Sequence, residues 1–267
     1  MAQQDKGEST VRALEKALNI LEHLSRVPEE IDLATLAKGT RIPKSTLLRL
    51  MHTLKKHHFI QQNHKSQKYQ IGWAFIYFGK IASKFFTLPN IIHPFLEELV
   101  AKTGETASAA ILEGDHAVYI DQVVSSSMIR GIPTIGSKVG LHCTSVGKVL
   151  LSAFSDEALE TFLETAVIEK KTEKTLNGKG ALREEIKKVR RQGYATDDEE
   201  TEVGGRCVAA PVLNREGVTV AAISIIGPTS RIRKEDFGRL SVLVRQTAVQ
   251  VSNALGCEAA SGFSGTG

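Results

Sequence analysis

Residues 41–58, RIPKSTLLRLMHTLKKHH, combine residue types that bind a polyanion. The stretch contains five Lys or Arg, three His and no acidic residue. At helical spacing its apolar residues fall on one stripe and its polar residues on the opposite one. The apolar stripe is Leu47, Leu50, Met51 and Leu54, and the polar stripe is Ser45, Arg49, His52 and Lys56, bordered by Thr46 and Thr53. Arginine can bond guanine bidentately, hydroxyls can bond phosphates or base edges, and lysines neutralise phosphates.

Taken alone, the charge of this stretch favours the solvated face of an ordinary helix. A basic amphipathic anchor for a membrane or partner is the other alternative. A solvated face normally intersperses Glu with Lys in i,i+4 pairs, and this stretch does not. A membrane anchor needs a bulky apolar face with no folded partner, whereas the preceding helices supply such a partner. The pattern therefore favours nucleic-acid binding.

The charge of the chain is unevenly distributed. Residues 1–87 hold 14 Lys/Arg and 7 Asp/Glu, a charge of +7, while the remainder carries −3. No acidic residue occurs from Leu33 to Leu96, an interval that contains ten Lys/Arg. A basic module joined to a mildly acidic one indicates that only the first module meets a polyanion.

The elements around the basic stretch follow the order of a winged helix-turn-helix. Leucines at three- and four-residue steps predict a first helix over 10–26, capped by Ser9 or Thr10. A short second helix is expected after Asp32 and a third over 44–57 with Pro43 at its first position, followed by a hairpin of strands 59–62 and 68–71. The predicted DNA-contacting residues are Arg41, Lys44, Ser45, Thr46, Arg49, His52 and Lys56, with Lys65 and Lys68 on the wing.

The rest of the chain reads as a linker helix and an α+β domain. Residues 73–86 are apolar and helical in pattern, and would connect two domains or form a dimer seam. Helices are expected over 89–103, 146–154, 156–165, 181–193 and 234–255, and strands over 106–114, 116–124, 127–133, 206–214 and 218–227. The turn Arg215–Gly217 predicts antiparallel pairing of the last two strands. Residues 258–267 are expected to be disordered.

Composition predicts a soluble, cytoplasmic protein with no structural metal or cofactor. The longest apolar runs fall short of a membrane span, and the N-terminus lacks the apolar core of a signal peptide. Three widely spaced cysteines fit neither a disulfide framework nor a CxxC site, so reduced thiols are expected.

From about residue 10 to 256 the sequence resembles the IclR family of bacterial transcription regulators. The resemblance lies in RALEKALNILEHL, in LATLAKGTRIPKSTLLRLMHTL, in the wing ending YQIG, in LHCTSVGKVLLSAF and in GYATDDEETEVGGRCVAAPVLN. The family signature in the last segment is matched by Gly193, Asp197, Glu200, Cys207, Val208, Ala209, Val212 and Asn214. Leu213 departs from it, because an aromatic residue or His is usual there.

The resemblance implies a regulator built from a winged helix-turn-helix over 1–72, a dimerising linker helix over 73–87 and a GAF-like effector-binding α/β domain over 88–257. It implies double-stranded, palindromic operators, homodimers or homotetramers, and a small organic acid as effector. The effector residues implied by position are Arg130, Ser145, Val146, Asp197, Cys207 and Ser224. Arg130 could instead form a surface salt bridge. Ile226 replaces a polar pocket residue of some relatives, which favours a larger or more apolar effector.

Other chemistry fits the sequence less well. The segment around Lys148 lacks the spacing of a phosphate-binding loop. The acidic run 197–200 has no His or Cys close by to complete a cation site, and Cys143 next to His142 is not yet a catalytic arrangement. Two rival functions remain open: a metabolite-binding or enzymatic protein with a basic interaction module, and an architectural DNA binder with an empty sensor domain.

Overall fold

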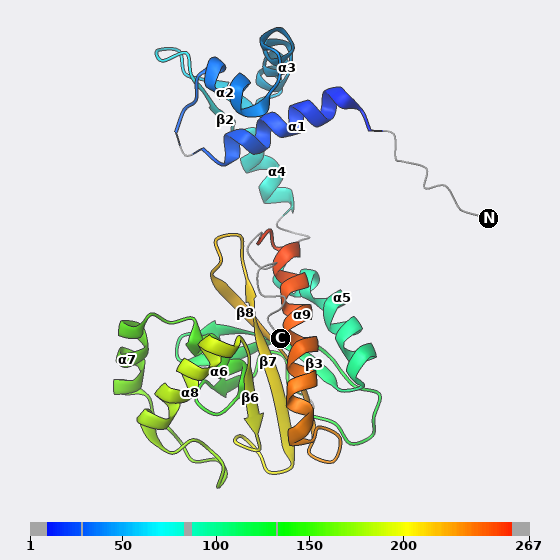
Figure 1. Ribbon diagram of the computed structural model, residues 1–267, viewed down its shortest axis with the longest axis vertical. Coiled ribbons are helices and arrows are strands. Elements are labelled where there is room, and N and C mark those ends of the chain that lie inside the picture. Colours follow the sequence, from blue (N-terminus) through cyan, green and yellow to red (C-terminus); the bar gives the residue numbers. More distant parts are fainter. Residues whose placement is uncertain (1–9, 28, 83–86, 132, 258–267) are drawn as a thin grey trace, which may run out of the picture. The chain divides into compact units, whose positions relative to one another are not determined.

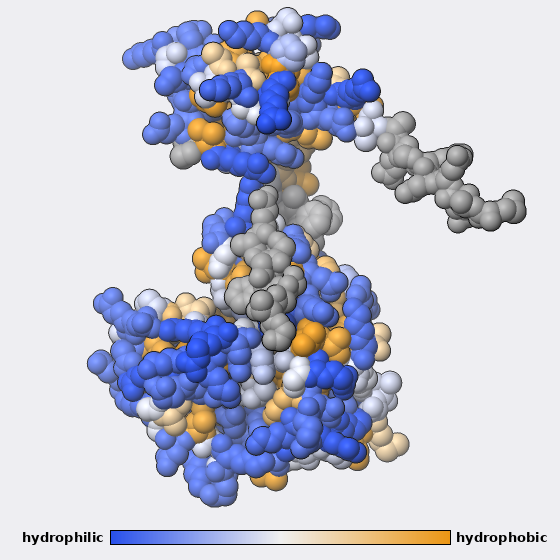
Figure 2. Space-filling model, in the orientation of Figure 1, coloured by the Kyte–Doolittle hydropathy of each residue, from blue (hydrophilic) through white to orange (hydrophobic). Residues whose placement is uncertain are grey.

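The computed structural model describes residues 10–27, 29–82, 87–131 and 133–257. The chain divides into two compact units, Met1–Phe86 and Thr87–Gly267. The disordered tail predicted for 258–267 and the end of the predicted linker helix, 83–86, lie outside the described residues. In the view of Figure 2, hydrophilic residues cover most of the surface of both units.

The N-terminal unit is a helix-turn-helix followed by a hairpin and one more helix (Figure 1). Its elements are α1 (Arg12–Ser25), α2 (Leu33–Thr40), α3 (Lys44–Lys56), β1 (Ile60–Gln62), β2 (Tyr69–Ile71) and α4 (Ala74–Ala82). Side chains from all three leading helices and both strands meet in one core that includes Ile20, Leu36, Leu47, Met51 and Ile60. The predicted three helices and hairpin are confirmed.

Two predicted details of these helices are wrong. Helix α1 begins after Val11, whose side chain offers no cap, so Thr10 does not cap the helix; Ser9 is outside the described residues. Pro43 occupies the N-cap position of α3 rather than its first turn. The predicted cap of α2 is confirmed, because Asp32 Oδ1 accepts the N–H groups of Ala34 and Thr35, each at 2.9 Å.

The C-terminal unit contains a six-stranded antiparallel sheet in the order β5-β4-β3-β8-β7-β6. The strands are β3 (Thr106–Glu113), β4 (His116–Val123), β5 (Lys138–Gly140), β6 (Ala195–Asp198), β7 (Gly205–Leu213) and β8 (Thr219–Pro228). Helices α5 (Leu88–Thr103) and α9 (Phe237–Ala254), the latter after a short 3-10 turn at Lys234–Asp236, pack on one face. Helices α6 (Ser145–Ser152), α7 (Asp156–Thr165) and α8 (Gly178–Gln192) cover the other (Figure 1).

Helix α6 lies against the sheet because small residues lie beneath it. Its residues share a core with five fully buried alanines, Ala110, Ala117, Ala195, Ala209 and Ala222. A Cβ on Gly147 would come within 2.5 Å of the Leu141 Cα, so this position requires glycine. The sequence VGKVLLS therefore forms a helix that is buried almost all round.

The strand pattern of the C-terminal unit differs from the prediction at three places. Residues 127–133 form no strand in their described part. Gly131 lies close to β8 instead, because a Cβ added to it would meet the Ile226 side chain at 2.7 Å. The short edge strands β5 and β6 were not predicted, because three or four residues carry too little alternation to identify a strand. Each helix in the described part of the chain is too short or too polar to span a bilayer.

Candidate functional site

Helix α3 carries the predicted DNA-contacting residues on the outside of the N-terminal unit. Leu47, Met51 and Leu54 are buried in the core, and Leu50 packs against it. On the opposite side Thr46 is half-buried, and the other predicted residues are exposed: Lys44, Ser45, Arg49, His52 and Lys56. The division into one buried and one exposed stripe is therefore present in the folded chain.

The turn before α3 determines where this helix begins. Arg41 follows α2 in the left-handed conformation, with φ of 56°, and reverses the chain. This conformation is uncommon for a residue other than glycine, asparagine or aspartate. The Arg41 side chain is exposed at the start of α3, on the side where the helix N-terminus adds positive potential. Arg41 and Lys44 therefore extend the basic character of the helix toward its N-terminal end.

The hairpin is held to the helices by Glu30. Its carboxylate accepts hydrogen bonds from Asn63 Nδ2 and Ser66 Oγ, both at 2.7 Å, and these bonds lower the pKa of Glu30. Ile31 also forms an antiparallel bridge with Tyr69. These contacts fix the turn between β1 and β2. Lys65 lies within this turn, Lys68 lies just before β2, and both side chains are exposed.

A hollow beside the hairpin adds residues that the sequence patterns did not single out. Lys55, His58, His64 and Trp73 line it together with Lys65. Lys55 Nζ donates to Gln62 Oε1 at 2.9 Å, and the His58 and Trp73 rings stack with centroids 4.6 Å apart. The available signal was the position of these residues in the acid-free interval, and it did not distinguish them from the other basic and aromatic residues there.

In the C-terminal unit, the structure brings five of the six predicted effector residues together on the α6 side of the sheet. Asp197 on β6 lies opposite Cys207 on β7, and Cys207 lies opposite Ile226 on β8. Ser145, the first residue of α6, lies close enough for its side chain to lower the pKa of the Cys207 thiol, which burial raises well above its usual value. Val146 is buried in the next position of the helix, and Ser224 is buried two residues before Ile226.

The strand register adds two further polar residues to this group. Gln122 on β4 lies opposite Ser108 on β3, and Ser108 lies opposite Ser224 on β8. Ser224 in turn lies opposite Ala209, which belongs to the core beneath α6, so the whole row faces that helix. The two serine hydroxyls are 2.9 Å apart and hydrogen-bonded. Sequence reasoning missed Ser108 and Gln122, because only the register shows them beside Ser224.

A buried ion pair borders the group. Lys148 on α6 is fully buried, and its Nζ lies 2.6 Å from Glu200 Oε1 and 4.0 Å from Glu185 Oε1. The Glu200 N–H donates to Asp197 Oδ1 at 2.6 Å, which joins the ion pair to the signature loop. Burial raises the pKa of Glu200 to about 7, against the opposing effect of Lys148, and burial also raises the pKa of Asp197.

The raised pKa of Glu200 predicts a pH dependence of stability. Because the folded protein holds the proton more tightly than the unfolded chain, this group's contribution is fully present below about pH 4.5 and is lost as pH rises through about 7. The loss is on the order of 3 kcal/mol at most. In calorimetry between pH 5 and 8, Glu200→Gln should therefore show a smaller fall in melting temperature than wild type. Glu202→Gln, at an exposed position, should keep the wild-type slope; equal slopes for all three proteins would contradict the assignment.

The other polar candidates are engaged elsewhere. Arg130 is exposed, and its Nη1 donates to the Ser127 carbonyl at 2.7 Å within its own loop, so the structure does not bring it to the buried group. The His142 ring lies 3.0 Å from the Glu169 carbonyl. Burial raises the pKa of the Cys143 thiol, which is the opposite of what a nucleophile requires.

Three carboxylates of the acidic run, those of Asp198, Glu199 and Glu200, have basic partners. Asp198 pairs with Arg206 at 2.6 Å, and Glu199 pairs with Lys174 at 2.5 Å. In the described ranges, no cluster of three or more His, Cys, Asp or Glu could hold a metal ion.

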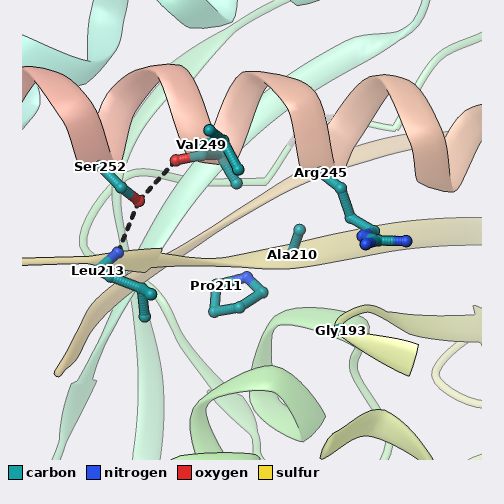
Figure 3. A pocket seen from close by; sticks show the side chains of 8 residues that line it. Gly193, Ala210, Pro211, Leu213, Arg245, Val249 and Ser252 are labelled. Carbon is teal, nitrogen blue, oxygen red and sulfur yellow. Dashed lines mark hydrogen bonds between the residues drawn. The ribbon is translucent and has the colours of Figure 1, made fainter. Parts of the chain in front are cut away.

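A small pocket lies on the other face of the sheet, between β7 and α9 (Figure 3). It is lined mainly by apolar groups, with Ala210, Pro211 and Leu213 on β7 and Arg245 and Val249 on α9. Ser252 Oγ accepts the Leu213 N–H at 2.8 Å at one end. None of the predicted effector residues lines this pocket, so it is separate from the polar group beneath α6.

Two family models match this chain. The model for the IclR helix-turn-helix domain matches residues 13–64, and that for the C-terminal part of the bacterial transcriptional regulator IclR matches residues 84–253. The chain belongs to the IclR family.

The similarity to individual IclR-family proteins covers nearly the whole chain. The HTH-type transcriptional regulator XynR of Escherichia coli strain K12 is 32% identical over 246 residues, 92% of this chain and 98% of its own. The transcriptional repressor AllR of the same strain is 32% identical over 248 residues, 93% and 92% of the two chains. The crystal structure of Thermotoga maritima IclR has a TM-score of 0.61 at 29% identity and covers 92% of this chain and 99% of its own.

Membership of the IclR family assigns a role to each unit. The N-terminal unit is the helix-turn-helix DNA-binding domain and the C-terminal unit is the effector domain of a transcriptional regulator. IclR regulators bind DNA operators and small-molecule effectors. The protein is a regulator and not an enzyme, like its relatives, which removes the rival interpretation of a catalyst with a basic interaction module.

Proposed function

We propose that this IclR-family regulator is a repressor that binds a palindromic operator as a homodimer or homotetramer and responds to a small organic acid. The observation that carries the proposal is the exposed polar stripe of α3, centred on Arg49, above a buried apolar stripe. The repressor role is proposed by analogy with the transcriptional repressor AllR, which is 32% identical to this chain.

Each DNA-contacting residue is given a role by its chemistry and position. Arg49, Ser45 and Thr46 read base edges in the major groove, with His52 beside them. Arg41, Lys44 and Lys56 bind phosphates at the two ends of α3, and Lys65 and Lys68 bind the backbone from the wing. These contacts combine base readout with sequence-independent affinity that weakens as salt rises.

Dimerisation is assigned to α4. Along this helix, large apolar side chains are exposed on several sides, including Ile76 at 76%, Tyr77 at 60% and Phe78 at 51%. Continuous exposed apolar surface of this kind marks a protein interface. A second copy of α4 would bury it and would set two reading helices at the spacing of a palindrome.

Ile76→Asp is expected to convert the dimer into a monomer, because a carboxylate would have to be desolvated in the interface. Size-exclusion chromatography with light scattering measures the change. Val167→Asp, at an 86% exposed site of the C-terminal unit, is the matched control and should remain dimeric. A dimer that tolerates Ile76→Asp would overturn the assignment of α4.

The effector is assigned to the polar group beneath α6. The Ser145 and Val146 N–H groups begin the helix and have no partner within it, while Thr144 Oγ1 accepts the Gly147 N–H at 3.0 Å. A carboxylate placed there would meet two N–H donors and the positive end of the helix dipole. Asp197, Cys207 and Ser224 would contact the remainder of the molecule.

The test measures operator binding and its release on the same protein. Fluorescence anisotropy on palindromes upstream of the gene and its neighbours should show salt-sensitive, sequence-specific binding. A thermal-shift screen of organic acids should then find a compound that raises the melting temperature and releases the operator. Binding that no acid affects, with no shift in melting temperature, would instead favour a constitutive architectural DNA binder.

A further inference from the structure

Gln122 on β4 carries a polar atom that the folded chain leaves without a partner. The residue is half-buried, but its Oε1 is buried and has no hydrogen-bond partner among the described residues. Buried side-chain acceptors in native proteins are almost always paired with protein, water or ligand. The orphaned Oε1 therefore indicates a position where a donor is expected to bind.

The neighbours of Gln122 show that this position belongs to the polar group beneath α6. Across the sheet its row continues through Ser108 and Ser224, whose hydroxyls bond each other. That bond uses one of the two hydroxyl protons, so the pair can still both donate and accept. Asp121, the preceding residue, faces the opposite side and pairs with His93 of α5. The alternation of the strand therefore directs Gln122 toward α6.

Side-chain cations near this row are already engaged. Lys148 pairs with Glu200 and Glu185, and Arg130 is exposed in its loop. Among the described residues that form the row, recognition thus falls to uncharged groups: two hydroxyls and the side-chain amide of Gln122, whose buried oxygen is the atom left unpaired. An amide oxygen is only an acceptor, so its complement is an O–H or N–H donor.

We infer that Gln122 is a specificity-determining residue that accepts a hydrogen bond from a hydroxyl of the effector, so that the effector is a hydroxy acid. The inference rests on the proposed effector site, in which the start of α6 takes the carboxylate. A keto acid of the same length offers only acceptors beyond its carboxylate and would leave Oε1 unpaired. Sites built to bond a hydroxyl discriminate strongly against analogues that lack it.

The first test needs no ligand. Gln122→Met removes the unpaired buried oxygen and keeps the length of the side chain, so it should raise the melting temperature of the unliganded protein by about 2–4 °C. A glutamine with a structural role, or one paired with water, would lower the melting temperature on replacement. The control is Gln250→Met, at an exposed site on α9, which should change nothing. A fall for Gln122→Met overturns the inference.

The second test compares matched acids by isothermal titration calorimetry. The probes are two matched pairs, lactate with pyruvate and 2-hydroxyglutarate with 2-oxoglutarate, whose keto acids carry no hydroxyl. Wild type should bind the hydroxy acid of at least one pair tenfold or more tightly than the matching keto acid. Gln122→Met should remove that preference, and the control Gln250→Met should keep it. Ser108→Ala should reduce the preference in the same direction.

The two proposals fail differently. Acids that bind wild type without preference for the hydroxyl, or with a preference that Gln122→Met retains, overturn the role of Gln122 and leave the organic-acid site standing. If no acid of any pair binds, both the hydroxy acid and the organic-acid assignment are overturned.

Discussion

Arg49→Ala is expected to lower affinity for the operator by about ten- to a hundredfold, while affinity for unrelated DNA falls much less. A bidentate contact between arginine and guanine contributes about 1–3 kcal/mol of discrimination against the wrong base. Arg49 is exposed at the middle of the polar stripe of α3, where the helix would lie deepest in the groove. Fold stability should be unchanged, because the opposite stripe holds α3 to the core.

Competition binding with operator and scrambled duplexes measures this change. Arg12→Ala removes the same charge from an exposed site at the start of α1 and should leave the ratio of the two affinities unchanged. A proportional loss on both duplexes for Arg49→Ala would mean that the residue binds phosphate only, and α3 would then not be the helix that reads bases.

The N-terminal unit could be predicted from sequence because its signals are local. Three amphipathic periods, the cap at Asp32 and a short polar turn determine the order of its elements, and the structure differs only at helix ends. The position of the wing depends on Glu30 reaching Asn63 and Ser66 across more than thirty residues. No periodicity encodes such a contact. The sequence therefore predicted that the wing follows α3, but not which residues hold it against the helices.

The candidate effector site of the C-terminal unit was predicted less completely, because the pairing of distant strands brings its residues together. Gln122 and Ser224 are 102 positions apart in sequence and become members of one row only when β4, β3 and β8 pair. The run Met128–Arg130 has the apolar character of a strand, yet Met128 is 95% exposed in a loop. Apolar composition alone does not distinguish an exposed loop from a buried strand.

Lys148→Met is expected to destabilise the C-terminal unit by about 3–5 kcal/mol, because it leaves buried Glu200 without its cation. For a unit of this size, that corresponds to a fall of about 10 °C or more in melting temperature. The loss should be smaller at pH 5 than at pH 8. Without the cation, the pKa of Glu200 rises further. At pH 5 the carboxyl is then protonated at little cost in folding free energy. At pH 8 the folded protein must either protonate Glu200 or bury its charge, and both are unfavourable.

The double variant Lys148→Met/Glu200→Met separates charge from packing. Removing both partners of a buried ion pair is often nearly neutral, so the double variant should recover most of the stability lost in the single variant and lose its pH dependence. Calorimetry at the two pH values measures both effects. If the double variant is as unstable as the single one, the loss does not come from an uncompensated charge on Glu200, and the ion pair itself holds the signature loop against α6.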